Sequence, residues 1–469
     1  MTSTHLWTAA FLYRALTHKY NLLIMTTCHL MGFKRLQTLR PDSRSGPPDD
    51  MRGLWLLLGL VAAANAERLF TGDQVIRVSV QSDEQMQVLQ ALENQQEWEL
   101  DFWLHPVSAE LPVDIRVPRS SVSPVTEYLA ARGIPYSVVI DNLQELLDEE
   151  KAEMEENQMK ERSGRSFNFG AYHRLETIYS WMDSLVAQHP KLVTKQEIGR
   201  SYENRPMYVL KFSTGGDNRP AIWMDTGIHS REWVSQATGV WTANKIATDY
   251  GTDASLTSLL DTMDVYMLLL ANPDGYAYTH SNDRMWRKTR SKNSGSVCRG
   301  VDPNRNWDAG FGGPGASRNP CSDSYHGPSA HSEVEVKNVV DLVQSHGNFK
   351  AFISVHAYSQ LLMYPYGYTC KNALHQSELD SVGRAAVQKL TSLYGTQYKV
   401  GSICNIIYQA SGGSIDWSYN LGIKYSFAFE LRDTGRYGFI LPANQIVPTA
   451  SETWLALKHI VEYVRDHPY

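Results

Sequence analysis

The chain has 469 residues, of which 42% are hydrophobic, and a formal net charge of −6. This length predicts two or more domains, and the apolar content is sufficient for a sizeable core. The negative charge argues against nucleic acid as a partner, because it implies no strongly basic face.

Residues 51–66 have the pattern of a secretory signal peptide. The segment MRGLWLLLGLVAAANA combines a basic start, an apolar stretch and an A-x-A cleavage signal. The apolar stretch is too short to span a bilayer, so we expect a secreted protein without a membrane anchor. Residues 1–50 do not fit in front of a signal peptide, and we expect this upstream extension to be absent from the secreted protein.

Residues 67–140 have the pattern of a small α+β domain. Segments with strand character alternate with segments of helical spacing in the order QVIRVSV, DEQMQVLQALEN, WELDFWL, VDIRVP, SPVTEYLAARG and PYSVVI. The second and fifth of these are the helical ones. The resulting order β-α-β-β-α-β is typical of a ferredoxin-like open sandwich.

An acidic segment follows this domain. From Glu145 to Glu161 it holds eight acidic residues against two lysines and is rich in helix formers, so we expect a solvated connecting helix. The helix is followed by ERSGRS, in which two Arg-Ser bonds are good targets for a trypsin-like protease. An ordinary linker is the alternative interpretation of this segment.

From about Phe167 the pattern changes to that of a larger domain. Continuous apolar runs alternate with helical segments such as HRLETIYSWMDSLVAQHP; the runs are MYVLKF, AIWMDTG, VYMLLLA, AFISVH and YSFAFE. Strands without polar alternation are usually buried on both faces. We therefore predict one α/β domain of roughly 300 residues, with a mixed, mostly buried sheet flanked by helices.

The cysteines suggest an oxidising environment. Cys28 lies upstream of the signal peptide, and the four that remain are Cys298, Cys321, Cys370 and Cys404. An even number in a secreted chain suggests two disulfides, with three possible pairings. We favour the local pairing, 298 with 321 and 370 with 404, because it closes the shortest loops. Zinc binding by these cysteines is less favoured, since C-x-x-C spacing is absent.

Several apolar runs end on residue types that bind zinc. His229 and Glu232 follow AIWMDTG, His356 ends AFISVH, and Glu430 ends YSFAFE. Two histidines and a carboxylate can hold Zn²⁺ and leave one position for water, and a further glutamate can move a proton of that water. A buried core histidine is the alternative for His356, whereas a carboxylate after an apolar run needs a partner or a function.

The pattern H-x-x-E is weak evidence in itself, because it occurs four times in this chain. Three of these pairs, beginning at His173, His375 and His459, fall in amphipathic helical stretches, where residues three apart are normally surface neighbours. His229 instead follows a buried strand, and Glu232 stands where a helix opens. The carboxyl ends of strands are where open α/β sheets carry their sites.

Basic and amide side chains could complete such a site. Arg287 lies in MWRKTR, and Asn304 and Arg305 lie in VDPNRNWD. Surface salt bridges are the ordinary function of arginine, but a guanidinium also binds a carboxylate through two parallel hydrogen bonds. Asp302 could accept the second ring N–H of a histidine that binds zinc.

Together these residues resemble a known family, the pancreatic metallocarboxypeptidases of the A type. The resemblance rests on HSRE, NPDGY, MWRKTR, VDPNRNWDAGFG, SYHGP, HAYSQLLMYPYGY, IYQASGGSIDW and FELRDTGRYGF. It runs from about residue 167 to 469, and the upstream domain resembles the activation segment of that family. The resemblance implies an activation propeptide at 67–162, a catalytic zinc carboxypeptidase domain at 163–469, and one zinc ion.

The resemblance also implies roles for individual residues. His229, Glu232 and His356 would bind zinc, with Glu430 as the general base and Arg287 as the stabiliser of the oxyanion. The implied substrate-binding residues are Asn304, Arg305 and Tyr408 around the terminal carboxylate, Arg231 and Tyr358 in neighbouring subsites, and Ile415 and Ala428 in the pocket for the terminal side chain. Two residues depart from the family pattern, Ala357 where we expect Ser and His331 where we expect Asn.

We therefore expect a secreted zymogen that acts on peptide and protein C-termini after a trypsin-like protease removes its propeptide. The apolar Ile415 favours aromatic or bulky aliphatic terminal residues, and the small Ala428 leaves room for a large ring. We expect a monomer with no nucleic-acid or membrane partner. The alternatives are a non-catalytic binding protein of the same fold and a zinc deacylase of small amides; a serine hydrolase is disfavoured because G-x-S-x-G is absent.

Overall fold

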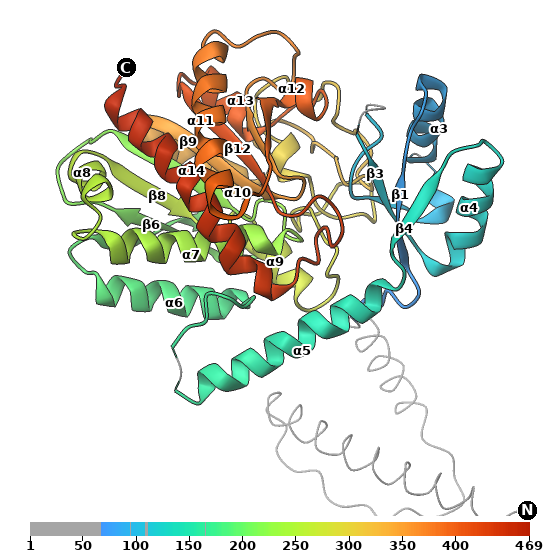
Figure 1. Ribbon diagram of the computed structural model, residues 1–469, viewed down its shortest axis with the longest axis horizontal. Coiled ribbons are helices and arrows are strands. Elements are labelled where there is room, and N and C mark those ends of the chain that lie inside the picture. The colour runs from blue at the N-terminus through green and yellow to red at the C-terminus, as the bar shows by residue number, and fades with distance from the viewer. Residues whose placement is uncertain (1–66, 94, 108–110, 165) are drawn as a thin grey trace, which may run out of the picture. The chain divides into compact units, whose positions relative to one another are not determined.

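The computed structural model describes residues 67–469 except 94, 108–110 and 165 (Figure 1). These residues belong to one unit, 66–469. The expected signal peptide, the upstream extension and Cys28 lie outside the described residues. Within the described ranges, no helix is both long enough and apolar enough to cross a membrane.

The first part of the described chain is the predicted open sandwich. Its elements are β1 (Gln74–Val78), α3 (Asp83–Glu93), η1 (Gln96–Trp98), β2 (Asp101–Phe102), β3 (Val113–Val117), η2 (Arg119–Ser121), α4 (Val122–Ala130) and β4 (Tyr136–Ile140). The strands form an antiparallel sheet in the order β2-β3-β1-β4. Ile76 and Ile115 of this sheet share a buried core with Leu89 of α3 and Leu129 of α4. The predicted order β-α-β-β-α-β is thus confirmed.

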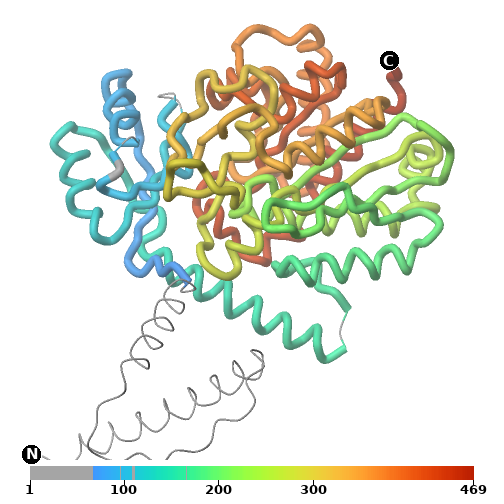
Figure 2. Tube along the Cα trace, turned by 180° about the vertical axis from the view of Figure 1, so that it is seen from behind, coloured from blue at the N-terminus to red at the C-terminus, as the bar shows by residue number. Residues whose placement is uncertain are grey.

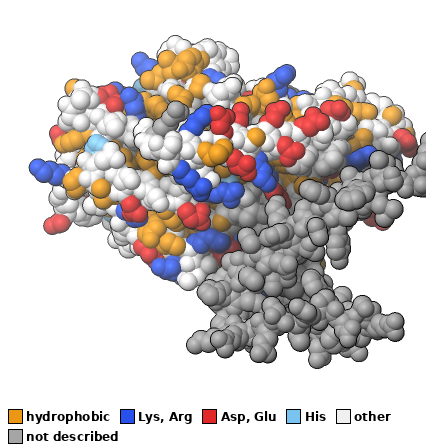
Figure 3. Space-filling view, turned by 90° about the horizontal axis from the view of Figure 1, so that it is seen from below, with side chains coloured by type: hydrophobic (Ala, Val, Ile, Leu, Met, Phe, Trp, Pro, Cys, Tyr) orange, Lys and Arg blue, Asp and Glu red, His pale blue; other side chains and the backbone are white. Residues whose placement is uncertain are grey.

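Helix α5 (Leu143–Arg162) is the predicted connecting helix, and it runs along the lower side of the view in Figure 1. The view from below in Figure 3 shows acidic and basic side chains intermixed on the visible surface of the molecule. The prediction of a solvated connecting helix is wrong for one side of it, however. Leu143 and Leu147 are buried in the main core, and Glu150 forms an ion pair with Arg284. The ion pair and hydrogen bonds such as that from the Phe70 N–H to the Gln144 side chain add to these few apolar contacts.

The larger part of the chain is built on an eight-stranded mixed sheet. Its strands are β5 (Val193–Arg200), β6 (Pro206–Phe212), β7 (Ala221–Thr226), β8 (Asp264–Leu268), β9 (Phe349–Ala357), β10 (Leu361–Tyr364), β11 (Lys399–Ser402) and β12 (Tyr425–Leu431). The order is β11-β10-β12-β9-β7-β8-β6-β5. The central strands β12, β9, β7 and β8 are parallel to one another, so their carboxyl ends meet at one edge.

Helices cover both faces of this sheet, as the continuous apolar strands predict. The helices of this part are α6 (Leu175–Gln188), α7 (Trp233–Asp249), α8 (Ala254–Thr262), α9 (Pro273–Thr279), α10 (Val334–His346), α11 (Gln376–Tyr394), α12 (Ile403–Ile406), α13 (Ser414–Asn420) and α14 (Ile446–Asp466), with the short turns η3 (Pro303–Arg305) and η4 (Ala443–Gln445). Helix α14 lies in front of the sheet in Figure 1, and α10 lies in front of it in the reverse view of Figure 2.

The alternation of side chains along a strand assigns them to these two layers. In β7, Ile222 and Met224 pack in the core that holds α6, α7, α11 and α14. Trp223, between them, packs in the opposite core with Val340 of α10 and Trp417 of α13. Residues of β9 and β12 that share the second face with Trp223 include the candidate site residues.

Two disulfides are present in the described chain, Cys298–Cys321 and Cys370–Cys404. The local pairing favoured from the sequence is therefore confirmed. The first disulfide lies in the long, mostly irregular connection between α9 and α10, which also carries Arg287 and the segment 302–305. The second joins the segment after β10 to the start of α12.

Candidate zinc centre and active site

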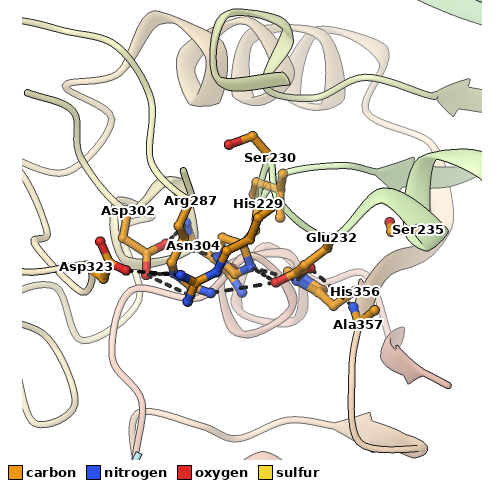
Figure 4. A network of polar contacts seen from close by, with 12 residues as sticks. His229, Ser230, Glu232, Ser235, Arg287, Asp302, Asn304, Asp323, His356 and Ala357 are labelled. Carbon is orange, nitrogen blue, oxygen red and sulfur yellow. Dashed lines mark hydrogen bonds and ion pairs between the residues drawn. The ribbon is translucent and has the colours of Figure 1, made fainter. Parts of the chain in front are cut away.

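The two predicted histidines and Glu232 converge at the carboxyl ends of β7 and β9. His229 lies three residues beyond β7, Glu232 is the N-cap of α7, and His356 lies at the end of β9. The turn after β7 depends on Gly227, whose φ is +69° and whose Cβ, if it had one, would lie 2.6 Å from the Gln236 side chain. Figure 4 shows the three side chains directed toward one another.

The donor atoms of these three residues have the spacing of a metal site. One ligand atom of each lies within 4.8 Å of the other two. His229 Nδ1 lies 3.2 Å from His356 Nδ1 and 2.7 Å from Glu232 Oε1, and His356 Nδ1 lies 3.3 Å from Glu232 Oε2. Two ligand atoms of a tetrahedral zinc ion are separated by about 3.3 Å, given the usual zinc–nitrogen distances. The residues present therefore fit zinc.

Polar contacts behind the ligands orient them. His229 Nε2 lies 3.1 Å from Asp302 Oδ1, as predicted, and the Ala357 backbone N–H donates to Glu232 Oε2 at 3.2 Å. The second contact was not predicted, and it does not depend on the residue 357 side chain. Burial, together with the charge of Arg287, lowers the pKa of His229. A low pKa favours the neutral imidazole that metal binding requires.

Asp302 also joins this ligand to the predicted basic residues. Its Oδ2 accepts from Arg287 Nη2 at 2.9 Å, its Oδ1 accepts from the Asn304 backbone N–H at 2.9 Å, and Arg305 Nη1 lies 3.9 Å from Oδ2. Burial would raise the pKa of Asp302, but Arg287 and His229 hold it well below its ordinary value. The carboxylate is therefore ionised. Arg287 Nη1 lies 3.6 Å from Glu232 Oε1, on the zinc-ligand side.

Glu430 lies directly beside the zinc ligands. It is the partner of His356 in the parallel pairing of β12 with β9. Within the part of the chain that the structure describes, no hydrogen bond reaches its carboxylate. Burial raises the pKa of Glu430 to about 8; Glu232 also raises it, whereas His356 lowers it. The charge of a bound zinc ion would act in the lowering direction.

The predicted carboxylate-binding residues also come together. Arg305 Nη2 donates to the Tyr408 hydroxyl at 2.7 Å, and the Asn304 side-chain oxygen accepts from the Ser414 backbone N–H at 3.0 Å. Next to Ser414, Ile415 is buried in one apolar cluster with Ala428 of β12. Both predicted pocket residues therefore pack on the same face of the sheet. The hydrogen bond between Ser414 and Asn304 places Ile415 near the carboxylate-binding residues.

Arg231 and Tyr358 contact the open sandwich. Arg231 Nη1 donates to Asp101 Oδ1 at 3.0 Å, and the Tyr358 hydroxyl donates to Asp114 Oδ2 at 2.8 Å. The Trp103 ring lies edge-on to Tyr358, with centroids 6.5 Å apart. No role for the two aspartates or for Trp103 was predicted from the sequence. The sequence signal that could have identified the two aspartates is an acidic residue within a short strand segment, in WELDFWL and in VDIRVP.

Neither of the two departures from the family pattern falls on a zinc ligand or on the proposed base. His331 Nε2 accepts from the Asp308 backbone N–H at 3.2 Å, and the edge of its ring faces Trp307 and Trp417. Ala357 contributes its backbone N–H, as described above. Neither residue removes a ligand or the partner of a ligand.

The other H-x-x-E pairs do not form metal sites among the described residues. The prediction that all three lie within helices needs correction. His459 and Glu462 do lie in α14, but His173 precedes α6 and His375 is the N-cap of α11. The apolar pattern in the sequence begins before the helices themselves do. Residues next to a helix can continue its apolar pattern without having helical backbone.

Comparisons with known proteins agree with this site. The zinc carboxypeptidase family model matches residues 178–456, and the carboxypeptidase activation peptide model matches residues 76–150. Carboxypeptidase A2 of Mus musculus is 62% identical over 419 residues, and carboxypeptidase A1 of Sus scrofa is 58% identical over 419 residues. Each alignment covers 89% of this chain and 100% of the relative.

Solved structures show the same fold. Thrombin activatable fibrinolysis inhibitor (TAFI) is 38% identical, with a TM-score of 0.78 over 85% of this chain and 100% of that chain. Carboxypeptidase A from Helicoverpa armigera is 27% identical, with a TM-score of 0.77 over 86% of this chain and 100% of that chain. With both family models matched and the His-Glu-His zinc site assembled, the chain belongs to the zinc carboxypeptidase family, as an A-type zymogen that carries its activation peptide.

Proposed function

We propose that this zymogen, once its propeptide is removed, hydrolyses the last peptide bond of a substrate with Glu430 as the general base. The main observation in support is the position of Glu430, which pairs with the zinc ligand His356 in the sheet. Its carboxylate has no hydrogen-bond partner in the described chain. A bound zinc ion would polarise the scissile carbonyl and acidify the attacking water.

The protein's own groups would carry the proton and the developing charge. Glu430 takes a proton from the water as it attacks, and later gives that proton to the leaving amine. Arg287, which Asp302 holds at two nitrogen atoms, faces the site and stabilises the oxyanion. One such donor is typically worth about 3–4 kcal/mol of transition-state stabilisation.

The neighbouring polar groups support cleavage at the C-terminus only. Arg305, Asn304 and Tyr408 form a cationic, hydrogen-bonding group that suits the free carboxylate of a peptide. Ile415 and Ala428 offer an apolar pocket for its last side chain, which favours aromatic and bulky aliphatic residues. An internal peptide bond has no carboxylate for this group, so we infer that the enzyme removes one residue at a time.

The open sandwich supports inhibition of the uncleaved chain. Asp101 and Asp114 pair with Arg231 and Tyr358, the two proposed subsite residues. Burial would raise the pKa of Asp101, but Arg231 and Arg116 lower it below its ordinary value. An ionised Asp101 is thus a charged occupant of the region where a longer substrate would lie.

We propose cleavage by a trypsin-like protease after Arg162, with Arg165 as a second site, and domains at 67–162 and 163–469. Arg162 ends α5, and both Arg162 and Ser163 are exposed. We also propose secretion through the signal peptide at 51–66, without residues 1–50. Two disulfides support this compartment. A monomer remains our prediction for the oligomeric state.

The two alternative functions have less support. A non-catalytic relative would be expected to lack the base or Arg287, and both are in place. A zinc deacylase of small amides would be expected to lack the activation segment and the carboxylate-binding group. This chain matches the activation peptide family, and its Arg305 and Tyr408 are in contact.

The substitution Glu430→Gln tests the proposed base. We expect the variant to bind zinc as the wild type does and to lose roughly 10²–10⁴ in kcat, the usual contribution of a general base. Zinc content by atomic absorption and steady-state hydrolysis of a blocked dipeptide give the two values. Turnover near that of the wild type would refute the role of Glu430.

A further inference from the structure

His356 ends a series of buried polar side chains that the proposed mechanism does not use. Its Nε2 lies 3.1 Å from the Ser354 hydroxyl oxygen. The Ser354 hydroxyl donates to Asp225 Oδ1 at 2.6 Å, and Trp223 Nε1 donates to Asp225 Oδ2 at 2.8 Å. Each of these side chains is at most 4% exposed. A buried serine and a buried carboxylate within apolar strands require an explanation.

The sheet itself brings these residues together. Asp225 of β7 is the direct partner of Ser354 in the parallel pairing of β7 with β9. Ser354 precedes His356 by two residues, so both side chains lie on the same face of β9. Trp223 precedes Asp225 by two residues on β7 and shares that face. The polar residue within AIWMDTG and within AFISVH is the sequence signal for this arrangement.

The hydrogen bonds determine which ring nitrogen of His356 carries its proton. A carboxylate only accepts hydrogen bonds, so the Ser354 proton is directed to Asp225. The Ser354 oxygen can then only accept from His356, which places the ring proton on Nε2. Nδ1, which faces His229 and Glu232, is left with the free electron pair that a metal needs.

We propose that Ser354 and Asp225 are positioning residues that hold His356 in its zinc-binding tautomer. This inference rests on the zinc site of the proposed function. The two histidine ligands are then oriented differently, His229 by the carboxylate of Asp302 directly and His356 by a carboxylate acting through a hydroxyl. Partners of this kind typically affect metal affinity by 10- to 100-fold.

The substitution Ser354→Ala tests the hydroxyl. In the full secreted precursor, we expect zinc to bind about 10- to 100-fold more weakly, as measured by competition with a chromophoric chelator. Ser426→Ala is the matched control. Ser426 is a fully buried serine on β12 whose hydroxyl donates to the Ile423 carbonyl at 2.8 Å. Its removal should lower stability comparably and leave zinc affinity within about twofold.

The substitution Asp225→Asn tests the direction of the hydrogen bonds. The Trp223 N–H requires an acceptor, so the amide oxygen would face Trp223 and the amide N–H groups would face Ser354. The Ser354 proton would then turn toward His356 and favour the tautomer that cannot bind zinc through Nδ1. We expect a loss of zinc affinity of about 10-fold or more although the side chain keeps its shape.

The double variant decides between positioning and general destabilisation. Without the Ser354 hydroxyl, Asp225→Asn should change zinc affinity by no more than about threefold, because the two residues act in series. Fully multiplied losses, or equal losses in Ser354→Ala and Ser426→Ala, would overturn the inference. Failure of the wild type itself to bind zinc would instead overturn the proposed function, so the two failures are distinguishable.

Discussion

Two glutamates of the site have different environments, which suit the different tasks proposed for them. Burial would raise the pKa of Glu232, but His229 and His356 lower it below its ordinary value, as suits a permanently ionised ligand. Glu430 has no such hydrogen-bonded partners in the described chain, and burial raises its pKa to about 8. A carboxylate that holds a proton more tightly is the stronger base.

At the same scale, Ile415→Asp should change the preferred terminal residue. An unpaired carboxylate in an apolar pocket disfavours Phe or Leu and attracts Lys or Arg, so we expect kcat/KM for a C-terminal Phe to fall by roughly 10²-fold or more. Release of C-terminal Lys should become measurable. Ile415→Val, as control, should stay within about tenfold. A variant that folds and still releases only Phe would contradict the pocket assignment.

Glu335 should make stability depend on pH. It lies at the start of α10, where Oε1 accepts from the Tyr202 backbone N–H at 2.9 Å and buried Oε2 has no hydrogen-bond partner in the described chain. Burial, with the nearby charges of Glu333 and Asp274, raises its pKa from 4.5 to about 7. Between these values the folded chain keeps a proton that the unfolded chain has released. Its stabilising contribution is therefore complete below pH 4.5 and is lost as pH rises through 7.

The variant Glu335→Gln removes this titration. Compared with it, the wild type should lose up to about 3 kcal/mol of unfolding free energy between pH 4.5 and pH 8. Urea unfolding in the presence of a chelator measures the difference without a contribution from zinc release. Stability curves that run parallel for the two proteins would show that the group does not titrate in this range.

At the scale of elements, α5 is held by a buried ion pair as well as by its few buried apolar residues. Arg284 donates to both oxygens of Glu150, at 2.7 Å and 3.0 Å, and lies over the Trp233 ring at 3.6 Å. Both charged side chains are less than a tenth exposed. Removal of one partner from such a pair leaves a buried charge without compensation.

We therefore expect Glu150→Gln to loosen α5 in the intact chain. The cost should be about 3–5 kcal/mol, the usual effect of breaking a buried ion pair. Amide hydrogen exchange of residues 143–162 should accelerate accordingly. Glu149→Gln, next to it and exposed, is the matched control and should remain within about 0.5 kcal/mol of the wild type. Equal exchange in the two variants would contradict the inference that the ion pair with Arg284 holds α5 in place.

At the scale of the whole described chain, the small sheet and the large sheet are joined by polar contacts as well as by α5. Arg77 of β1 donates to Asp114 and to the Thr434 carbonyl, and Asp114 accepts from Tyr358. These contacts involve the proposed subsite residues and not the three zinc ligands. The zinc centre can therefore form before the propeptide is removed.

This arrangement predicts that tryptic cleavage creates activity without creating the metal site. The intact precursor should contain zinc and be nearly inactive on blocked dipeptides ending in Phe, Trp or Leu. Activity should appear as the bond after Arg162 is cut and disappear on addition of a chelator. Equal activity before and after cleavage would contradict inhibition by residues 67–162.

Much of this protein was readable from local patterns. The apolar runs predicted five strands of the large sheet. The segments before it predicted the order of strands and helices along the chain in the small domain. The zinc ligands were predicted because residues at the ends of buried strands meet at one edge of an open α/β sheet, and the same argument led to the proposal for Glu430. Strands β5, β10 and β11 were not predicted. Strands β5 and β11 carry no continuous apolar run, and the apolar run of β10, LLMY, is only four residues long.

Only the tertiary structure decided the pairings between distant segments. That Glu150 meets Arg284, that Asp101 meets Arg231, and that Asp225 reaches His356 through Ser354 follows from sheet register and docking. A sequence records which side chains can ionise or donate, but the partner of each is set by backbone geometry over long separations. The sequence by itself therefore determined which residues bind zinc. The fold determined how these residues are oriented and which residues of the propeptide contact the site.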